Sequence, residues 1–112
     1  MIDYELAEQA VLSAMLHDES GLATAQAGEA LTKDDFSTTD RGTIFETCLR
    51  LSPCNEIDLI IEHPKLKDEI LFLSEKYGGG GIERYIEYLI EYRNTRAVEL
   101  ALYHATDDLK AN

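Results

Sequence analysis

The chain has 112 residues, enough for one domain with one modest core but not for a second domain of ordinary size. Its formal net charge of −12 argues against non-specific DNA binding, because phosphates would be repelled, and its 45% hydrophobic content argues against a disordered chain. No stretch approaches the roughly eighteen uninterrupted apolar residues of a membrane span, and no secretory signal precedes Tyr4. We therefore expect a single cytoplasmic domain over residues 1–112, with protein partners rather than nucleic acid or membrane.

The first predicted element is a helix over residues 4–16. Small and aliphatic side chains recur along it at three- and four-residue steps, and Leu12 and Leu16 extend this apolar stripe round a second side. Only Gln9, Ser13 and the first-turn acids are left for water. A helix that is apolar on more than one face is normally surrounded by other helices, so we expect it to be the central helix of an all-α domain.

The next stretch predicts two further helices separated by a short acidic turn. Ser20 is a suitable cap for an alanine-rich helix that runs to about Leu31. Thr32 can accept hydrogen bonds at the start of the acidic turn, which leads to Phe36 as an apolar anchor. Residues 40–51 then predict an amphipathic helix, whose apolar positions are Ile44, Phe45, Cys48 and Leu49.

The middle of the chain predicts two short helices and a turn. Asp58 is a plausible N-cap for the first, and the second covers residues 64–77, with Pro64 in its first turn. The four consecutive glycines at 78–81 lose too much backbone entropy to continue a helix, so they predict a turn. They are not a phosphate-binding loop, because no Lys-Ser/Thr pair follows them.

A helical pattern starts again at Ile82, weakens at residues 92–95, and resumes from Val98 to Leu109. Asn94 or Thr95 could cap a separate last helix over about residues 95–110, and the pattern equally permits one continuous helix. A break near Asn94 would favour a closed monomeric bundle.

Several of these segments together resemble the N-terminal domain of DnaB-type replicative helicases. The family's first helix has the pattern acidic-x-Glu-Gln-x-Val-Leu-Gly-x-x-Leu. This chain matches it with Ser13 in place of the glycine and Leu6 in place of the acid; the matching residues are Glu8, Gln9, Val11, Leu12 and Leu16.

Four further motifs follow in the family's order. Asp35 and Phe36 match an Asp-Phe pair, and Ile44 and Phe45 match the end of an Arg-x-Ile-Phe helix start in which Gly42 replaces the arginine. The remaining matches are an Ile-Asp-Leu segment and a Gly-Gly turn, formed here by Ile57, Asp58, Leu59, Gly78 and Gly79.

The resemblance implies a compact all-α bundle of about six or seven helices that serves as the collar of a helicase. In the family the last region leads into a helical hairpin through which two copies pair, and a continuous helix from Ile82 onward would favour this pairing. Here residues 95–110 are expected to be the truncated start of that hairpin. Its expected partners are the C-terminal helicase-binding domain of primase, the helicase motor domain, other helicase subunits and the helicase loader. The chain lacks the motor's nucleotide-binding motif, so we expect no enzyme activity of its own. The alternative is a free-standing phage or mobile-element regulator that binds the host helicase or primase.

No catalytic, metal-binding or cofactor-binding residues are predicted. Acidic pairs such as Asp34-Asp35 and Asp107-Asp108 are expected by chance among 22 acids and suit solvated helix ends. Cys48 and Cys54 lack a second pair, and we expect them to be reduced thiols, with Cys48 buried and inert. The three histidines lie on separate predicted elements without a partner at helical spacing, at positions 17, 63 and 104.

The clearest candidate binding residues are tyrosines near the C-terminus. Tyr88 and Tyr92 lie one turn apart on a face other than that of Tyr85, which suits either an exposed binding patch or ordinary packing at the domain edge. The resulting candidate protein interface comprises Tyr85, Tyr88, Tyr92, Leu102 and Tyr103.

Overall fold

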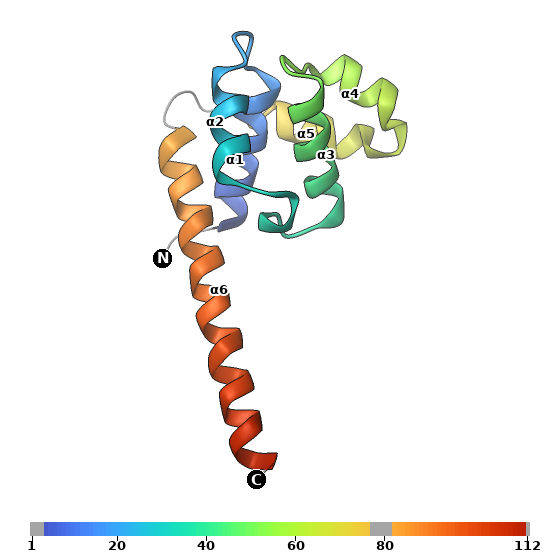
Figure 1. Ribbon diagram of the computed structural model, residues 1–112. Helices are drawn as coiled ribbons and strands as arrows, with labels where there is room; N and C mark the ends of the chain where they lie inside the picture. The colour runs from blue at the N-terminus through green and yellow to red at the C-terminus, as the bar shows by residue number, and fades with distance from the viewer. Residues whose placement is uncertain (1–3, 77–81, 112) are drawn as a thin grey trace.

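The computed structural model describes residues 4–76 and 82–111, and for residues 99–111 it describes the helix alone. Over this part of the chain there are six α-helices, two short 3-10 helices and no strand, which confirms the all-α prediction (Figure 1). None of the described helices is long and apolar enough to cross a membrane. The elements are α1 (Tyr4–Leu16), α2 (Leu22–Ala30), η1 (Lys33–Asp35), α3 (Thr39–Arg50), α4 (Glu56–Glu62), η2 (Pro64–Leu66), α5 (Lys67–Ser74) and α6 (Ile82–Ala111).

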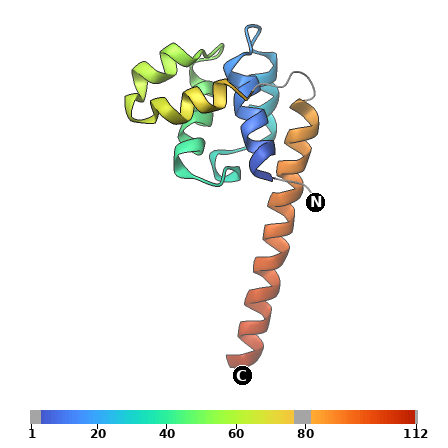
Figure 2. The same cartoon turned by 180° about the vertical axis from the view of Figure 1, so that it is seen from behind.

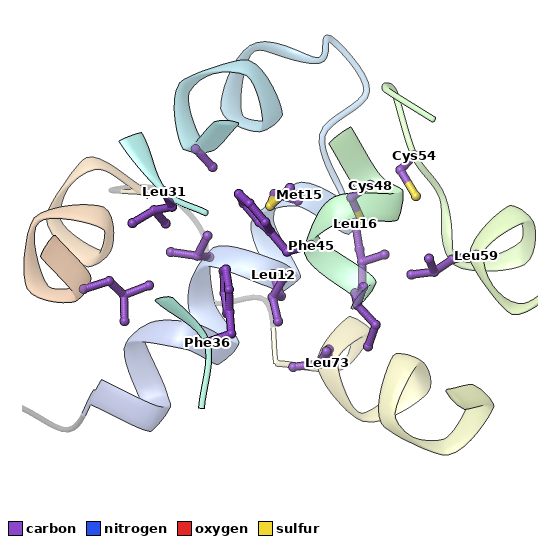
Figure 3. Packing of buried hydrophobic residues seen from close by; sticks show 14 of the residues in the cluster. Leu12, Met15, Leu16, Leu31, Phe36, Phe45, Cys48, Cys54, Leu59 and Leu73 are labelled. Carbon is purple, nitrogen blue, oxygen red and sulfur yellow. The ribbon is translucent and has the colours of Figure 1, made fainter. Parts of the chain in front are cut away.

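Helix α1 is the centre of the bundle, as its apolar pattern predicts. It packs against α2, α3, α5 and α6, and Leu12, Met15 and Leu16 point into a core that also receives Phe45 from α3 and Leu73 from α5 (Figure 3). Burial of this apolar surface is the main force that holds the helices together.

The prediction that Gln9 and Ser13 face water is wrong. Gln9 is 7% exposed and Ser13 is fully buried. The reason is that helices pack on every side of α1, so the polar positions left over by its apolar stripes are covered as well.

The start of α2 also differs from the prediction that Ser20 is its cap. Gly21 occupies the cap position with φ 79°, a left-handed conformation that favours glycine. The Asp18 carboxylate accepts a hydrogen bond from the amide of Thr24 at 2.8 Å, while the Ser20 hydroxyl accepts one from the amide of Leu22 at 3.2 Å. Asp18 therefore satisfies an amide of the first turn from outside the helix.

The predicted cap at Thr32 is confirmed. Thr32 accepts a hydrogen bond from the amide of Asp34, and the Asp35 carboxylate accepts one from the amide of Thr32 at 2.8 Å, which makes a capping box at the start of η1. Phe36 follows and packs against Phe45, with ring centroids 4.8 Å apart. The predicted anchoring role of Phe36 is thus confirmed.

The prediction that Asp58 caps α4 is wrong by three residues. Asn55 is the cap, and its side-chain oxygen accepts a hydrogen bond from the amide of Asp58 at 2.9 Å. Both residues are good cap formers, and the side chain that precedes the first turn reaches the free amide.

The single helix predicted over residues 64–77 is two elements. The 3-10 turn η2 begins at Pro64, whose fixed φ suits a tight turn, and α5 then runs from Lys67 to Ser74. Ile70 and Leu73 on α5 are fully buried in the core. The predicted turn at Gly78 and Gly79 lies outside the described residues.

Helix α6 is continuous from Ile82 to Ala111, so the sequence's open choice at Asn94 is decided in favour of one helix. The Thr95 hydroxyl donates a hydrogen bond to the carbonyl of Glu91 at 2.9 Å, as inside a helix, and caps nothing. The first part of α6 lies beside α1, and the rest leaves the bundle as a straight arm (Figures 1 and 2). At 1.5 Å per residue the helix is about 45 Å long.

At Gly42, α3 lies so close to the backbone of η1 that a side chain at this position would disturb the packing of the two elements. A Cβ at position 42 would lie 2.9 Å from the carbonyl oxygen of Lys33, so Gly42→Ala should lower the free energy of unfolding by about 1–3 kcal/mol in urea denaturation. Gly28→Ala is the matched control, because its Cβ would meet only the flexible side chain of Leu49 and alanine favours helix. Equal effects of the two substitutions would contradict this account.

Candidate protein-interaction surface

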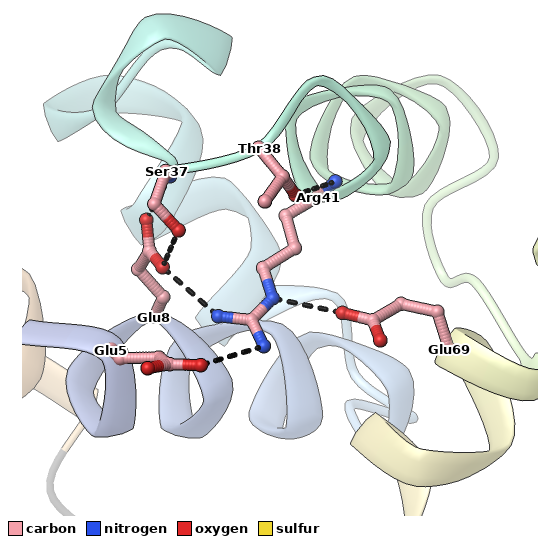
Figure 4. Close-up of polar contacts among 6 residues, drawn as sticks. All are labelled: Glu5, Glu8, Ser37, Thr38, Arg41 and Glu69. Carbon is pink, nitrogen blue, oxygen red and sulfur yellow. Dashed lines mark hydrogen bonds and ion pairs between the residues drawn. The ribbon is translucent and has the colours of Figure 1, made fainter.

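A buried ion-pair cluster joins three helices around Arg41 (Figure 4). The Arg41 guanidinium donates to Glu8 on α1 at 3.0 Å and to Glu69 on α5 at 2.8 Å, and it lies 3.6 Å from the Glu5 carboxylate. Thr38 caps α3 and accepts a hydrogen bond from the amide of Arg41 at 3.1 Å. One side chain thereby fixes α3 against both α1 and α5.

The Arg41–Glu8 pair at the centre of this cluster is buried but well satisfied. The side chains of Arg41 and Glu8 are 7% and 4% exposed, and the amide and hydroxyl of Ser37 also donate to the Glu8 carboxylate. Burial alone would lower the pKa of Arg41, but hydrogen bonds from its guanidinium to Glu69 and Glu8 outweigh it and raise the pKa above its ordinary value. Such a cluster orients helices, because each buried charge keeps its partners only in one arrangement.

Sequence reasoning singled out Glu8 but missed Arg41. The available signal was that Arg41 is the only cationic residue between Lys33 and Arg50, and that it directly precedes Gly42, which stands where the family has arginine. A lone cation on an amphipathic helix that packs against an acid-bearing helix is a candidate for a buried pair.

A second polar tie holds α6 where the arm leaves the bundle. Arg93 donates from Nε to Asp35 at 2.7 Å, from Nη2 to the other Asp35 oxygen, and from Nη2 to the carbonyl of Ala30 at 2.9 Å. The bidentate pairing of a guanidinium with a carboxylate fixes both distance and orientation. Arg93 therefore sets the point at which α6 becomes free of the body.

The pKa of Asp35 reflects this tie. Burial by itself would raise the pKa of Asp35, but the hydrogen bonds from Arg93 and from the amide of Thr32 outweigh it and hold the pKa below its usual value. Asp35, a motif residue of the sequence, thus closes the capping box of η1 and anchors α6 at the same time.

Three tyrosines in the first half of α6 are half-buried and packed within the chain. Tyr85 and Tyr88 pack against the core and touch edge to face, with centroids 6.3 Å apart, and Tyr92 stacks on Tyr4 of α1 at 4.4 Å. Ordinary packing therefore accounts for the position of all three rings. The side chains of the two other candidate interface residues, Leu102 and Tyr103, lie outside the described residues.

The outer face of α6 carries exposed aliphatic and acidic side chains. It forms a shallow hollow lined by Glu87, Ile90, Glu91, Asn94, Thr95 and Val98. Val98 is 58% exposed, and every described residue after Tyr92 is exposed. This outer face therefore sets the aliphatic side chains of Ile90 and Val98 beside the acids Glu87 and Glu91.

Most of the other motif residues are structural. The apolar motif residues other than Ile57 are buried. Ile57 and Asp58 are exposed on α4. The buried residues are Gln9, Val11, Leu12, Leu16, Phe36, Ile44, Phe45 and Leu59.

The cysteines and histidines form no reactive centre in the described part of the chain. Cys48 and Cys54 are buried free thiols, and a hydrogen bond to Cys54 together with burial raises the pKa of Cys48, which disfavours its thiolate. His17 contacts the carbonyl of Ser74 at 2.7 Å, and His63 contacts the hydroxyl of Thr47 at 2.9 Å. The described residues contain no group of three or more His, Cys, Asp or Glu side chains placed to hold a metal.

Fold and surface together define a small all-α domain with a packed bundle and a long projecting last helix. The family model for the DnaB-like helicase N terminal domain matches residues 4–99, and the chain belongs to this family. The N-terminal domain of DnaB is the non-catalytic part of the helicase. No curated protein and no solved structure matches the chain.

The buried cluster predicts a large effect of Arg41→Met. The substitution leaves the Glu8 carboxylate buried without its cation, so the free energy of unfolding in urea should fall by about 3–5 kcal/mol. Arg50→Met is the control, because the Arg50–Glu62 pair is 57% and 35% exposed and should contribute about 1 kcal/mol or less. Similar decreases in the free energy of unfolding for both variants would show that the buried Arg41 cluster contributes no more to stability than an exposed ion pair.

The lowered pKa of Asp35 predicts a pH dependence of stability. A carboxyl whose folded pKa is depressed stabilises the fold above its unfolded pKa of about 3.9, and this contribution disappears as the pH falls through the folded pKa. Asp35→Asn should therefore lower the free energy of unfolding by about 1–2 kcal/mol at pH 7 and by much less near pH 2. The effect at pH 7 is limited because the side chain of the partner, Arg93, is 42% exposed. Urea titrations of both proteins at the two pH values measure the difference, and a pH-independent deficit would count against this role.

Proposed function

We propose that the chain is a non-catalytic protein-interaction and oligomerisation domain of a replicative DNA helicase, which shapes the hexameric ring and recruits primase. The observation that carries the proposal is a continuous α6 that leaves the bundle with an exposed outer face, in a chain that belongs to the DnaB-like N-terminal family. A helix about 45 Å long cannot bury its far half against this bundle, so its free part suits contact with another chain.

The sequence of the free part supports pairing of helices. Val98, Leu102, Ala105 and Leu109 are separated by four, three and four residues, the alternation that gives neighbouring helices a common apolar seam. The tie between Arg93 and Asp35 supports the same idea, because it fixes the angle at which the arm leaves each subunit. Paired arms of fixed direction would set the spacing of subunits in the ring.

In this proposal primase binds to the same outer face of α6. The acidic chain, with a net charge of −12, favours protein partners over DNA, and the outer face of α6 presents Ile90 and Val98 beside Glu87 and Glu91. Binding of primase through its C-terminal helicase-binding domain would raise its effective concentration at the fork. The motor domain, other subunits and the loader are the remaining proposed partners.

The proposal predicts that Val98→Asp weakens assembly without unfolding the domain. Placing a charge in an apolar seam should reduce self-association, measured by sedimentation, about tenfold or more. Binding to the isolated helicase-binding domain of primase, measured by calorimetry, should weaken to a similar degree. Circular dichroism should remain that of the original protein, because Val98 is 58% exposed in the single chain.

Leu22→Asp is the matched control, since Leu22 is 74% exposed on α2 and lies outside α6. It should leave both self-association and primase binding unchanged. Normal assembly and normal primase binding by Val98→Asp would rule out the outer face of α6 as the interface.

A further inference from the structure

Helix α4 carries an exposed pair of isoleucines that the fold does not use. Ile57 is 65% exposed and Ile61 is 73% exposed, and residues four apart lie next to each other on one face of a helix. On the opposite side Leu59 is completely buried and holds α4 to the core. The pair is therefore an apolar patch on an anchored helix; we call Ile57, Asp58, Ile61 and Glu62 the α4 face.

Folding alone does not explain this choice of residues. Isoleucine has a lower helix propensity than the straight-chain polar residues, and a side chain that stays in water contributes no burial free energy. One exposed aliphatic residue is ordinary on a protein surface, whereas two adjacent ones on a helix of seven residues form a patch.

The position of α4 makes it independent of the arm. In both views of the molecule α4 lies at the end of the bundle away from α6 (Figures 1 and 2). A partner bound at α4 would thus leave the outer face of α6 accessible.

The charge beside the patch indicates the kind of partner. The exposed carboxylate of Asp58 follows Ile57 directly, and Glu62 follows Ile61, so acids run along one edge of the isoleucine pair. Glu62 also pairs with Arg50 in an exposed contact, which a partner's cation can join or replace. A second copy of this chain, with its net charge of −12, would bring like charges to that edge.

We propose that the α4 face is a second docking surface, which binds a basic amphipathic segment of another protein. Aliphatic side chains of the segment pack on Ile57 and Ile61, and its lysine or arginine side chains pair with Asp58 and Glu62. This mode uses apolar contacts for affinity and charges for orientation and choice of partner. It does not depend on the function proposed for α6.

A synthetic amphipathic helix built of leucine and lysine serves as the probe, with a leucine and glutamate helix of the same pattern as its charge-reversed counterpart. Amide chemical shifts of the whole domain locate the binding site, and calorimetry measures affinity. The lysine probe should shift amides of α4, and Ile57→Ser/Ile61→Ser should weaken its binding about tenfold or more. Leu22→Ser, which alters an equally exposed residue on α2, should bind the lysine probe as the original protein does.

Three results would overturn the proposal. The lysine probe could shift amides of α6 or of the whole surface rather than α4, which would reflect unspecific attraction to an acidic protein. The glutamate probe could bind as tightly as the lysine probe, which would remove the charge argument. Sedimentation could show self-association that Ile57→Ser/Ile61→Ser abolishes, which would make a second copy the occupant.

Discussion

The packing of four helices around α1 is the constraint on which the rest of this structure depends. With α2, α3, α5 and α6 all packed on it, its polar residues Glu8, Gln9 and Ser13 lose contact with water, so Glu8 needs a buried cation. Arg41 supplies that cation from α3 and reaches Glu69 on α5 with the same guanidinium. The apolar core brings the helices together, and this ion pair selects one arrangement of them, because any other would leave a charge unpaired in the interior.

A buried carboxylate paired with an arginine also fixes the place where α6 leaves the bundle. Ile86 and Leu89 bury the first part of the helix, and Tyr92 stacks on Tyr4 at its edge. Arg93 donates hydrogen bonds to Asp35, which also closes the capping box of η1. Beyond this point the described residues of α6 are exposed, so the helix changes from a core element to an arm within about one turn. An arm held by a rigid base can transmit a fixed direction to whatever binds it.

The two proposed surfaces lie on different parts of the molecule and share one chemistry. The outer face of α6 and the α4 face both set aliphatic side chains beside acids, at separate ends of the bundle. A partner bound on one of these faces would leave the other accessible.

The sequence by itself determined the all-α class, most of the core and the family. Three- and four-residue periodicity predicted the apolar positions of Val11, Leu12, Ile44 and Phe45, and the place of Thr32 before the acidic turn predicted its cap. Both kinds of prediction depend only on residues close together in the chain. Only the tertiary structure decided the burial of Gln9 and Ser13, the pairing of Arg41 with Glu8 and of Arg93 with Asp35, and the internal packing of the tyrosines. The pairs lie 33 and 58 positions apart, and local periodicity carries no information on which distant helix covers a given face. The weak pattern of residues 92–95 permits either a cap or a continuous helix, so the sequence left the continuity of α6 undecided. In the structure the helix is continuous, and Tyr92 and Arg93 pack against the bundle at this point.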